Sequence, residues 1–94
     1  MNSNITTETE ALQRLKDNLM NLSRELHSIY KFMTKSMRDL SNSWQDVKYQ
    51  EFVEGYTPQI NKCDEIATRY EQWCSKALQP AIDRTLEYLN SNAG

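Results

Sequence analysis

Three side chains of this sequence, His27, Cys63 and Cys74, are of types that bind metals or act as nucleophiles. His27 is the single histidine, and position 24 is Arg, so the Glu-x-x-His pair of a di-metal site in a helical bundle is missing. The cysteines have no further cysteine or histidine at the spacing of a zinc site. We therefore expect no metal ion and no cofactor, and interpret His27 as a solvated residue at the rim of a helix interface.

The two cysteines are also too far apart to bond to each other. On one helix they would share nearly the same face, but would lie roughly 16 Å apart along its axis. They are either two small buried apolar residues or a source of disulfides between subunits in an oxidising compartment. A nucleophilic pair of either cysteine with His27 would lack an orienting residue and a cleft. The sequence therefore predicts a protein without catalytic residues.

Composition predicts a single domain, residues 1–94, built from a few long elements. Of the 94 residues, 38% are hydrophobic and 26% charged, and only two are Gly and two Pro. The net charge of −2, with both signs interspersed, gives no basic patch for nucleic acid. No apolar run reaches the length of a membrane span. The N-terminal MNSNITTETE lacks the basic and apolar parts of a signal peptide, so we expect a cytoplasmic protein that, if exported, uses a signal-peptide-independent route.

Apolar residues of the first half recur at alternating steps of three and four, which predicts one amphipathic helix over about residues 7–40. Residues 1–6 are expected to be a frayed tail. Thr6, Thr7 or Thr9 could cap the helix, and Thr7 with Glu10 fits the spacing of a capping box. Lys16 and Arg24 are expected to face away from the apolar seam. The seam consists of Leu12, Leu15, Leu19, Leu22, Leu26, Ile29, Met33, Met37 and Leu40.

The second half predicts a kinked helix over about residues 46–89, after a turn at 41–46. Its core and interface positions include Tyr56, Ile60, Ile66, Tyr70, Trp73, Leu78 and Ile82. Adjacent apolar doublets widen this stripe, so the helix should contact more than one neighbour. Pro58 predicts a bend in a continuous helix, and the alternative is a break with Thr57 as the N-cap of a new helix. Pro80 predicts a second bend.

A short loop between two long helices makes them antiparallel neighbours, so the predicted fold class is an all-α helical hairpin. Two helices alone enclose no interior and would leave a large apolar surface in water. Pairing two hairpins into a dimeric four-helix bundle would bury that surface. An interface of roughly 2,000 Å², about half apolar, would contribute on the order of 25 kcal/mol before entropy and desolvation costs. A two-fold homodimer is the default, and a heterodimer with a paired chain stays open.

Trp44, Asp46 and Phe52 mark the turn and the start of the second helix. Either Ser43, in an approximate capping box with Asp46, or Asp46 itself could cap that helix. With the hairpin length, these residues resemble the WXG superfamily, the ESAT-like small helical proteins linked to type VII secretion. Members carry W-x-G in the loop and often an aromatic residue about eight positions later. Asp46 stands at the Gly position, which makes this a W-x-D variant, and both residue types serve as helix caps.

One element of the family is missing from the C-terminal part of the chain. Members end with Y-x-x-x-D/E after the second helix, and this sequence has Asn92 four residues after Tyr88 and Cys74 four residues after Tyr70. Export through this chain's own tail is therefore in doubt. A partner could carry the signal instead, or the protein could stay inside the cell.

The resemblance implies a non-enzymatic dimeric protein that acts as a secreted effector, an adaptor or an export partner. Its partners would be a second copy or a paired WXG-like protein, with the secretion machinery or a larger toxin in addition. The resemblance also implies that Trp44 docks a partner hairpin, whereas the residues alone suggest packing on Leu40 and Val47. The alternative function is a cytoplasmic coiled-coil adaptor or chaperone with no secretion role.

Overall fold

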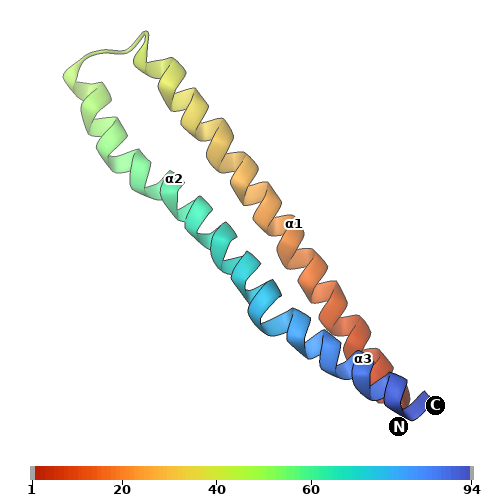
Figure 1. Ribbon diagram of the computed structural model, residues 1–94. Coiled ribbons are helices and arrows are strands. Elements are labelled where there is room, and N and C mark those ends of the chain that lie inside the picture. The colour runs from red at the N-terminus through yellow and green to blue at the C-terminus, as the bar shows by residue number, and fades with distance from the viewer. Residues whose placement is uncertain (1, 94) are drawn as a thin grey trace.

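A computed structural model of the chain describes residues 2–93 as two long antiparallel arms joined by a short turn (Figure 1). The first arm is α1, Asn2–Ser41. The returning arm consists of α2, Val47–Trp73, the π-helix η1, Cys74–Leu78, and α3, Gln79–Ala93. The molecule is a rod of 70 × 15 × 15 Å with both ends of the chain together at one tip. The prediction of an all-α hairpin is confirmed.

Both arms extend further toward the termini than the sequence predicted. Residues 2–6 belong to α1 rather than to a frayed tail, and Thr7 lies inside that helix instead of capping it. Met1 and Gly94 lie outside the described residues. At this tip α3 packs against α1, and tertiary packing stabilises helical turns that local preference alone would leave frayed. Thr9 is buried here, and its hydroxyl donates a hydrogen bond of 2.8 Å to the Ile5 carbonyl.

The turn between the arms is closed by backbone hydrogen bonds to the last residues of α1. The N–H groups of Ser43 and Trp44 both donate to the Leu40 carbonyl, at 3.0 and 2.9 Å. Asp46 then caps α2: its backbone is extended, and its side-chain oxygen accepts a hydrogen bond of 3.1 Å from the Tyr49 N–H. Of the two predicted capping alternatives, the structure therefore has Asp46 as the N-cap.

The two prolines of the returning arm have different consequences. Helix α2 runs continuously through Pro58, as predicted, so the alternative of a new helix beginning after Thr57 is wrong. Near Pro80 the helix widens into η1, in which the Gln79 N–H donates to the Cys74 carbonyl five residues earlier. Pro80 has no N–H, and in a regular α-helix its ring would clash with the carbonyl of Lys76. The wider turn directly before Pro80 accommodates this conflict without ending the arm.

Two series of residues, each with a spacing of seven, form the middle of the interface between the arms. On α1 the series contains polar residues: Thr9 and Ser23 are buried, and Lys16 is half-buried. The Lys16 ammonium group donates a hydrogen bond to the side-chain oxygen of Gln79. The expectation that Lys16 faces away from the interface is therefore wrong. The facing series on the returning arm is apolar and buried: Ile60, Ala67 and Cys74.

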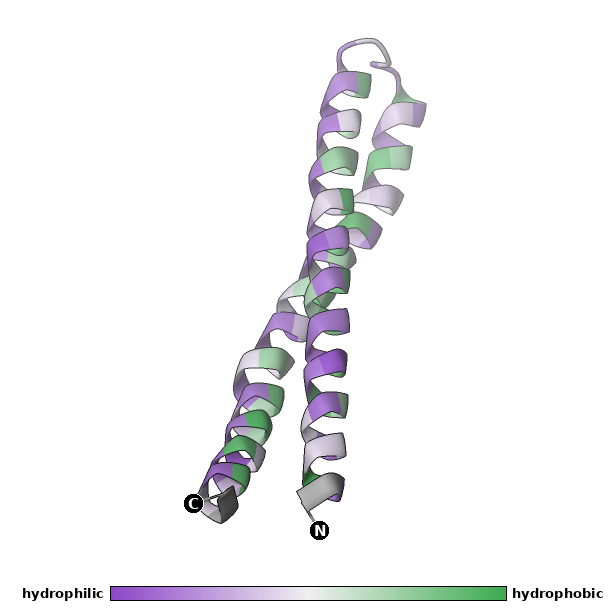
Figure 2. Cartoon of the chain, turned by 90° about the vertical axis from the view of Figure 1, so that its right-hand side faces the viewer, coloured by the Kyte–Doolittle hydropathy of each residue, from purple (hydrophilic) through white to green (hydrophobic). Residues whose placement is uncertain are grey.

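Consequently the predicted apolar seam is divided between the inside and the outside of the hairpin. Its half-buried members on α1 include Leu12, Leu19, Leu26, Met33, Met37 and Leu40, whereas Leu15, Leu22 and Ile29 are exposed. On the returning arm Ile60 and Ile82 are buried, Tyr56, Tyr70 and Leu78 are half-buried, and Ile66 and Trp73 are exposed. Figure 2 shows that hydrophobic residues recur along each arm beside hydrophilic ones.

Candidate functional site

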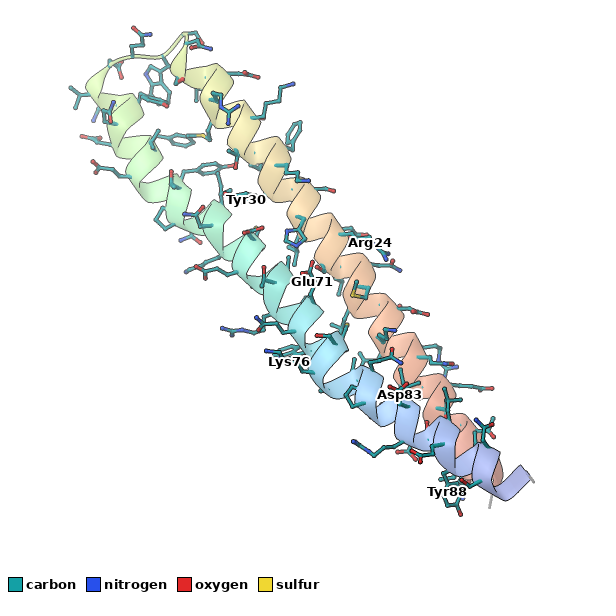
Figure 3. All side chains as sticks on the ribbon, in the orientation of Figure 1. Arg24, Tyr30, Glu71, Lys76, Asp83 and Tyr88 are labelled. Atoms are coloured by element: carbon teal, nitrogen blue, oxygen red, sulfur yellow. The ribbon has the colours of Figure 1, made fainter. Side chains whose placement is uncertain are left out.

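A polar cluster joins the two arms near the middle of the hairpin, which we call the His27 cluster and which consists of His27, Ser23, Asp64 and Glu71. The imidazole Nδ1 lies 2.9 Å from Asp64 Oδ1, and Nε2 lies 2.8 Å from Glu71 Oε1. The Ser23 hydroxyl lies 2.9 Å from the same Glu71 oxygen and 3.0 Å from the Ala67 carbonyl oxygen. Figure 3 shows Glu71 between the two arms.

The helices position these side chains by simple periodicity. Asp64 and Glu71 are two turns apart on α2 and therefore lie on the same face, one on each side of the imidazole. Between them Ala67 has an exposed fraction of 0%, and Ser23 opposite has 1%. Two small residues at this position let the backbones approach closely enough for the imidazole to span the gap.

Hydrogen bonding shifts the pKa values of the two main partners in opposite directions. The hydrogen bond to Glu71 is the largest cause that raises the pKa of His27; desolvation, the second largest, lowers that pKa, and the hydrogen bond to Asp64 raises it further. The hydrogen bond from His27, followed by that from Ser23, lowers the pKa of the Glu71 carboxyl. The cluster therefore favours an imidazolium between two carboxylates.

This arrangement is suited to holding the arms together rather than to catalysis. Both imidazole nitrogens are engaged by carboxylates, so neither is free to activate a nucleophile. Within the described residues, no group of three or more His, Cys, Asp or Glu side chains could hold a metal ion. The interpretation of His27 as a solvated rim residue was incomplete: its side chain is one-third exposed, but it bridges both arms.

The two cysteines have different environments. Cys74 is buried, its thiol contacts the Lys16 carbonyl at 3.6 Å, and burial raises the pKa of that thiol above its ordinary value. Cys74 therefore fits the reading of a small buried residue with a poorly reactive thiol. Cys63 is half-buried and lines a groove between the arms, and both thiols are free. Only Cys63 is placed where a partner could reach it.

Polar and apolar residues occupy opposite flanks of the contact between the arms. His27 and Ile29 are two residues apart, and so are Asp64 and Ile66, and Glu71 and Trp73. Two residues correspond to about 200° around a helix. Because the first member of each pair belongs to the His27 cluster, the second member points to the other flank. The hairpin thus has one flank with an ionic cluster and one flank with large apolar side chains.

We call the second flank the apolar face and define it by Leu15, Leu22, Ile29, Ile66 and Trp73. The exposed fractions of these residues are 47%, 45%, 49%, 42% and 49%, in that order. A groove of about 250 Å³ runs along this flank, lined by Ile29, Met33, Tyr56, Gln59, Ile60 and Cys63. The Tyr70 and Trp73 rings lie in contact, with centroids 5.6 Å apart. Several large apolar side chains exposed on one flank of a rod two helices thick are typical of a surface that another protein covers.

The predicted turn residues form an aromatic cluster at the tip of the hairpin. The Trp44 ring contacts those of Tyr49 and Phe52, with centroids 5.8 and 5.9 Å apart. Phe52 in turn stacks on Tyr56 at 5.1 Å. Trp44 is half-buried by these contacts, whereas Val47 is 72% exposed. The structure therefore brings Trp44 and Phe52 together, and the local partners of Trp44 are aromatic residues of the first turns of α2.

Sequence reasoning missed the His27 cluster because it assigned the helix contact to the apolar seam and considered His27 only as a metal ligand, a partner of a cysteine nucleophile or a solvated residue. One pattern could have located it: Thr9, Lys16 and Ser23 recur at intervals of seven along the first helix. Small and polar residues in a heptad series mark a close helix contact as well as large apolar ones do. The pairing of His27 with residues 64 and 71 depends on the register of the two arms, for which the sequence has no local pattern.

Comparisons with known proteins give no relative for this chain: no family model, no characterised protein and no solved structure matches it significantly. In the described part of the chain, no helix combines the length and apolarity that crossing a membrane requires.

Proposed function

We propose that this chain is a non-enzymatic, dimeric WXG-like protein that serves as an effector, adaptor or export partner of a type VII-like secretion system. The observation that carries the proposal is the apolar face. Among the residues whose burial the structure describes, the buried apolar side chains are a few small or medium ones, namely Ile60, Ala67, Cys74 and Ile82. Larger ones stay exposed along one flank, where a second hairpin would complete a four-helix bundle.

The partner that fits this face best is a second copy of the same chain. The apolar face contains residues of both arms, so two copies related by a two-fold axis would each supply half of a mixed four-helix core. The other flank carries the His27 cluster, whose charges would be costly to cover with an apolar partner. A paired WXG-like chain with a similar face remains the other candidate for the same position.

The tip of the hairpin supports the link to the WXG superfamily. The spacing of Trp44, Asp46 and Phe52 resembles the family motif. Asp46 caps α2, which is a role that both Gly and Asp can fill. The half-buried Trp44 still presents part of its ring at the surface. Its contacts with Tyr49 and Phe52 are compatible with both local packing and docking of a partner.

A cytoplasmic adaptor or chaperone is the second candidate, and one observation favours it. Tyr88 is followed by Asn92 where the family's export signal has an acidic residue. If this chain is exported, we propose that a partner supplies the acidic residue of the signal. An adaptor that holds such a partner in the cytoplasm would need the same apolar face but no signal of its own.

The dimer is tested by charge substitutions on the apolar face. We expect the wild type to sediment as a dimer at micromolar concentration and the double variant Leu22→Lys/Ile29→Lys to lose the dimer. Asn21→Lys/Ser28→Lys is the matched control. Both residues are exposed and seven apart, and each directly precedes a substituted residue, so it lies about 100° around the helix from the apolar face. A stably folded wild-type monomer at micromolar concentration, or equal loss of dimer in both variants, would contradict the proposal.

Export is tested separately by following the protein in culture fractions. In a host with a type VII-like system, we expect the chain in the medium without a cytoplasmic lysis marker. Deletion of the secretion ATPase should abolish this release. Retention in the cell at the same level in both strains would reject the secretion role and support the cytoplasmic adaptor.

A further inference from the structure

The His27 cluster contains more hydrogen-bond acceptors than a neutral imidazole can satisfy. A neutral imidazole carries one N–H, and its other nitrogen has a lone pair. Here both nitrogens lie within 3 Å of carboxylate oxygens, at 2.9 Å from Asp64 and 2.8 Å from Glu71. With one proton on the ring, a lone pair would face a negatively charged oxygen. Only the imidazolium donates to both carboxylates.

The charged side chains that contact the His27 ring from the other arm are both negative. Asp64 and Glu71 are the charged side chains that α2 presents to it. On α1, Arg24 and Lys31 lie about one turn away and are exposed, and Arg24 donates to Asn21 instead. In Figure 3 Arg24 points away from α2. The imidazolium is therefore the positive group that offsets the two carboxylates at this contact.

Ser23 links this charge state to the backbone contact of the arms. Its hydroxyl has one hydrogen, and two acceptors lie within reach, the Ala67 carbonyl and the Glu71 carboxylate. While His27 donates to Glu71, that carboxylate accepts at least one hydrogen bond, whether the Ser23 hydroxyl donates to Glu71 or to the Ala67 carbonyl. When the imidazolium loses its proton, either Asp64 or Glu71 loses its donor and repulsion appears between the arms.

We propose that the His27 cluster is a pH-dependent clasp, which fastens the two arms while the imidazole is protonated and loosens them as the ring loses its proton at higher pH. This regulation of the hairpin is independent of the proposed secretion role. The imidazolium is favoured in the folded chain, which raises the pKa of His27 above its ordinary 6.5. The stabilisation is therefore complete below pH 6.5 and is lost as the pH rises through that raised pKa.

The first test is a titration of the wild-type ring by proton NMR. Because His27 is the single histidine, its ring signal needs no assignment once any tag is removed. We expect a titration midpoint above 6.5 in the folded chain and a return toward the unfolded value in Asp64→Asn and Glu71→Gln. A wild-type midpoint at or below 6.5 would overturn the proposal, and this test requires no variant to fold.

The second test measures stability across the same range. We expect the thermal midpoint of the wild type to fall between pH 5.5 and pH 8.0, and His27→Gln to lose most of this fall. Both proteins are compared at one concentration, because dimer formation also shifts the midpoint. A pH dependence that persists unchanged in His27→Gln would assign the effect to another group and overturn the clasp. Neither test depends on dimer formation or export, so failure here leaves the proposed function standing.

Discussion

The Ser23 hydroxyl lies 3.0 Å from the Ala67 carbonyl oxygen, at a contact where both residues are almost completely buried. Ala67 is the middle residue of the buried series on the returning arm, and Ser23 is the last residue of the series on α1. Because both side chains are small, the backbones of the two arms can approach closely here, but the contact buries little apolar surface. The larger apolar residues are displaced to the flank, which explains how one hairpin can be ordered along its length and still expose a wide apolar face.

A larger side chain at the Ala67 position should separate the arms. We expect Ala67→Leu to lower the free energy of unfolding by about 1–3 kcal/mol, because the contact has no space for additional methylene groups. Ala11→Leu is the control, since Ala11 is exposed on α1 and its substitution should change stability by about 0.5 kcal/mol or less. Urea denaturation followed by circular dichroism measures both. Equal stability of the two variants would show that the arms do not pack closely at Ala67.

Removal of the Trp44 ring should weaken the tip. We expect Trp44→Ala to lower the free energy of unfolding by about 1–3 kcal/mol, because the ring loses its contacts with Tyr49 and Phe52. Val47→Ala, at an exposed neighbouring position, should have little effect. Sedimentation and the export assay of the same variant separate local packing from docking as the role of Trp44. An intact dimer with impaired export would indicate that Trp44 docks the secretion machinery. Normal export of Trp44→Ala would leave local packing as its function.

Loss of the cap should destabilise the start of α2. Asp46→Ala leaves the Tyr49 N–H without its acceptor, so we expect a loss of about 1 kcal/mol in the free energy of unfolding. Asp46→Asn should retain most of the stability, because an amide oxygen accepts the same hydrogen bond. If both substitutions had the same cost, the charge of Asp46 rather than its hydrogen bond would be responsible.

Acid should remove the contribution of Glu71. Hydrogen bonds from His27 and Ser23 lower the pKa of this carboxyl below its ordinary 4.5. Its contribution is therefore fully present above pH 4.5 and is lost as the pH falls through the lowered pKa. We expect the thermal midpoints of the wild type and Glu71→Gln to differ at pH 6 and to converge toward pH 3. A constant difference over this range would mean that the Glu71 charge makes no contribution.

The sequence by itself determined the helical arms and the position of the turn. Repeats of three and four residues, the scarcity of Gly and Pro, and the Ser-Asn-Ser segment before Trp44 are local features, and local physical chemistry acts on them directly. For the cap of α2 the sequence left Ser43 and Asp46 as alternatives, and the structure has Asp46, which bonds to a backbone N–H only three residues away. Continuity through Pro58 was also predicted, since the apolar positions keep their phase across it.

Only the tertiary structure decided which part of the apolar seam lies inside. Leu15, Leu22 and Ile29 follow the same periodicity as Leu19 and Leu26, so the sequence does not separate them. Their exposure results from the relative rotation and register of the two arms, which place Ser23 against Ala67. The ionic bridge of His27 has the same origin, because it joins residues that are 37 and 44 positions apart and meet only when the arms adopt that register.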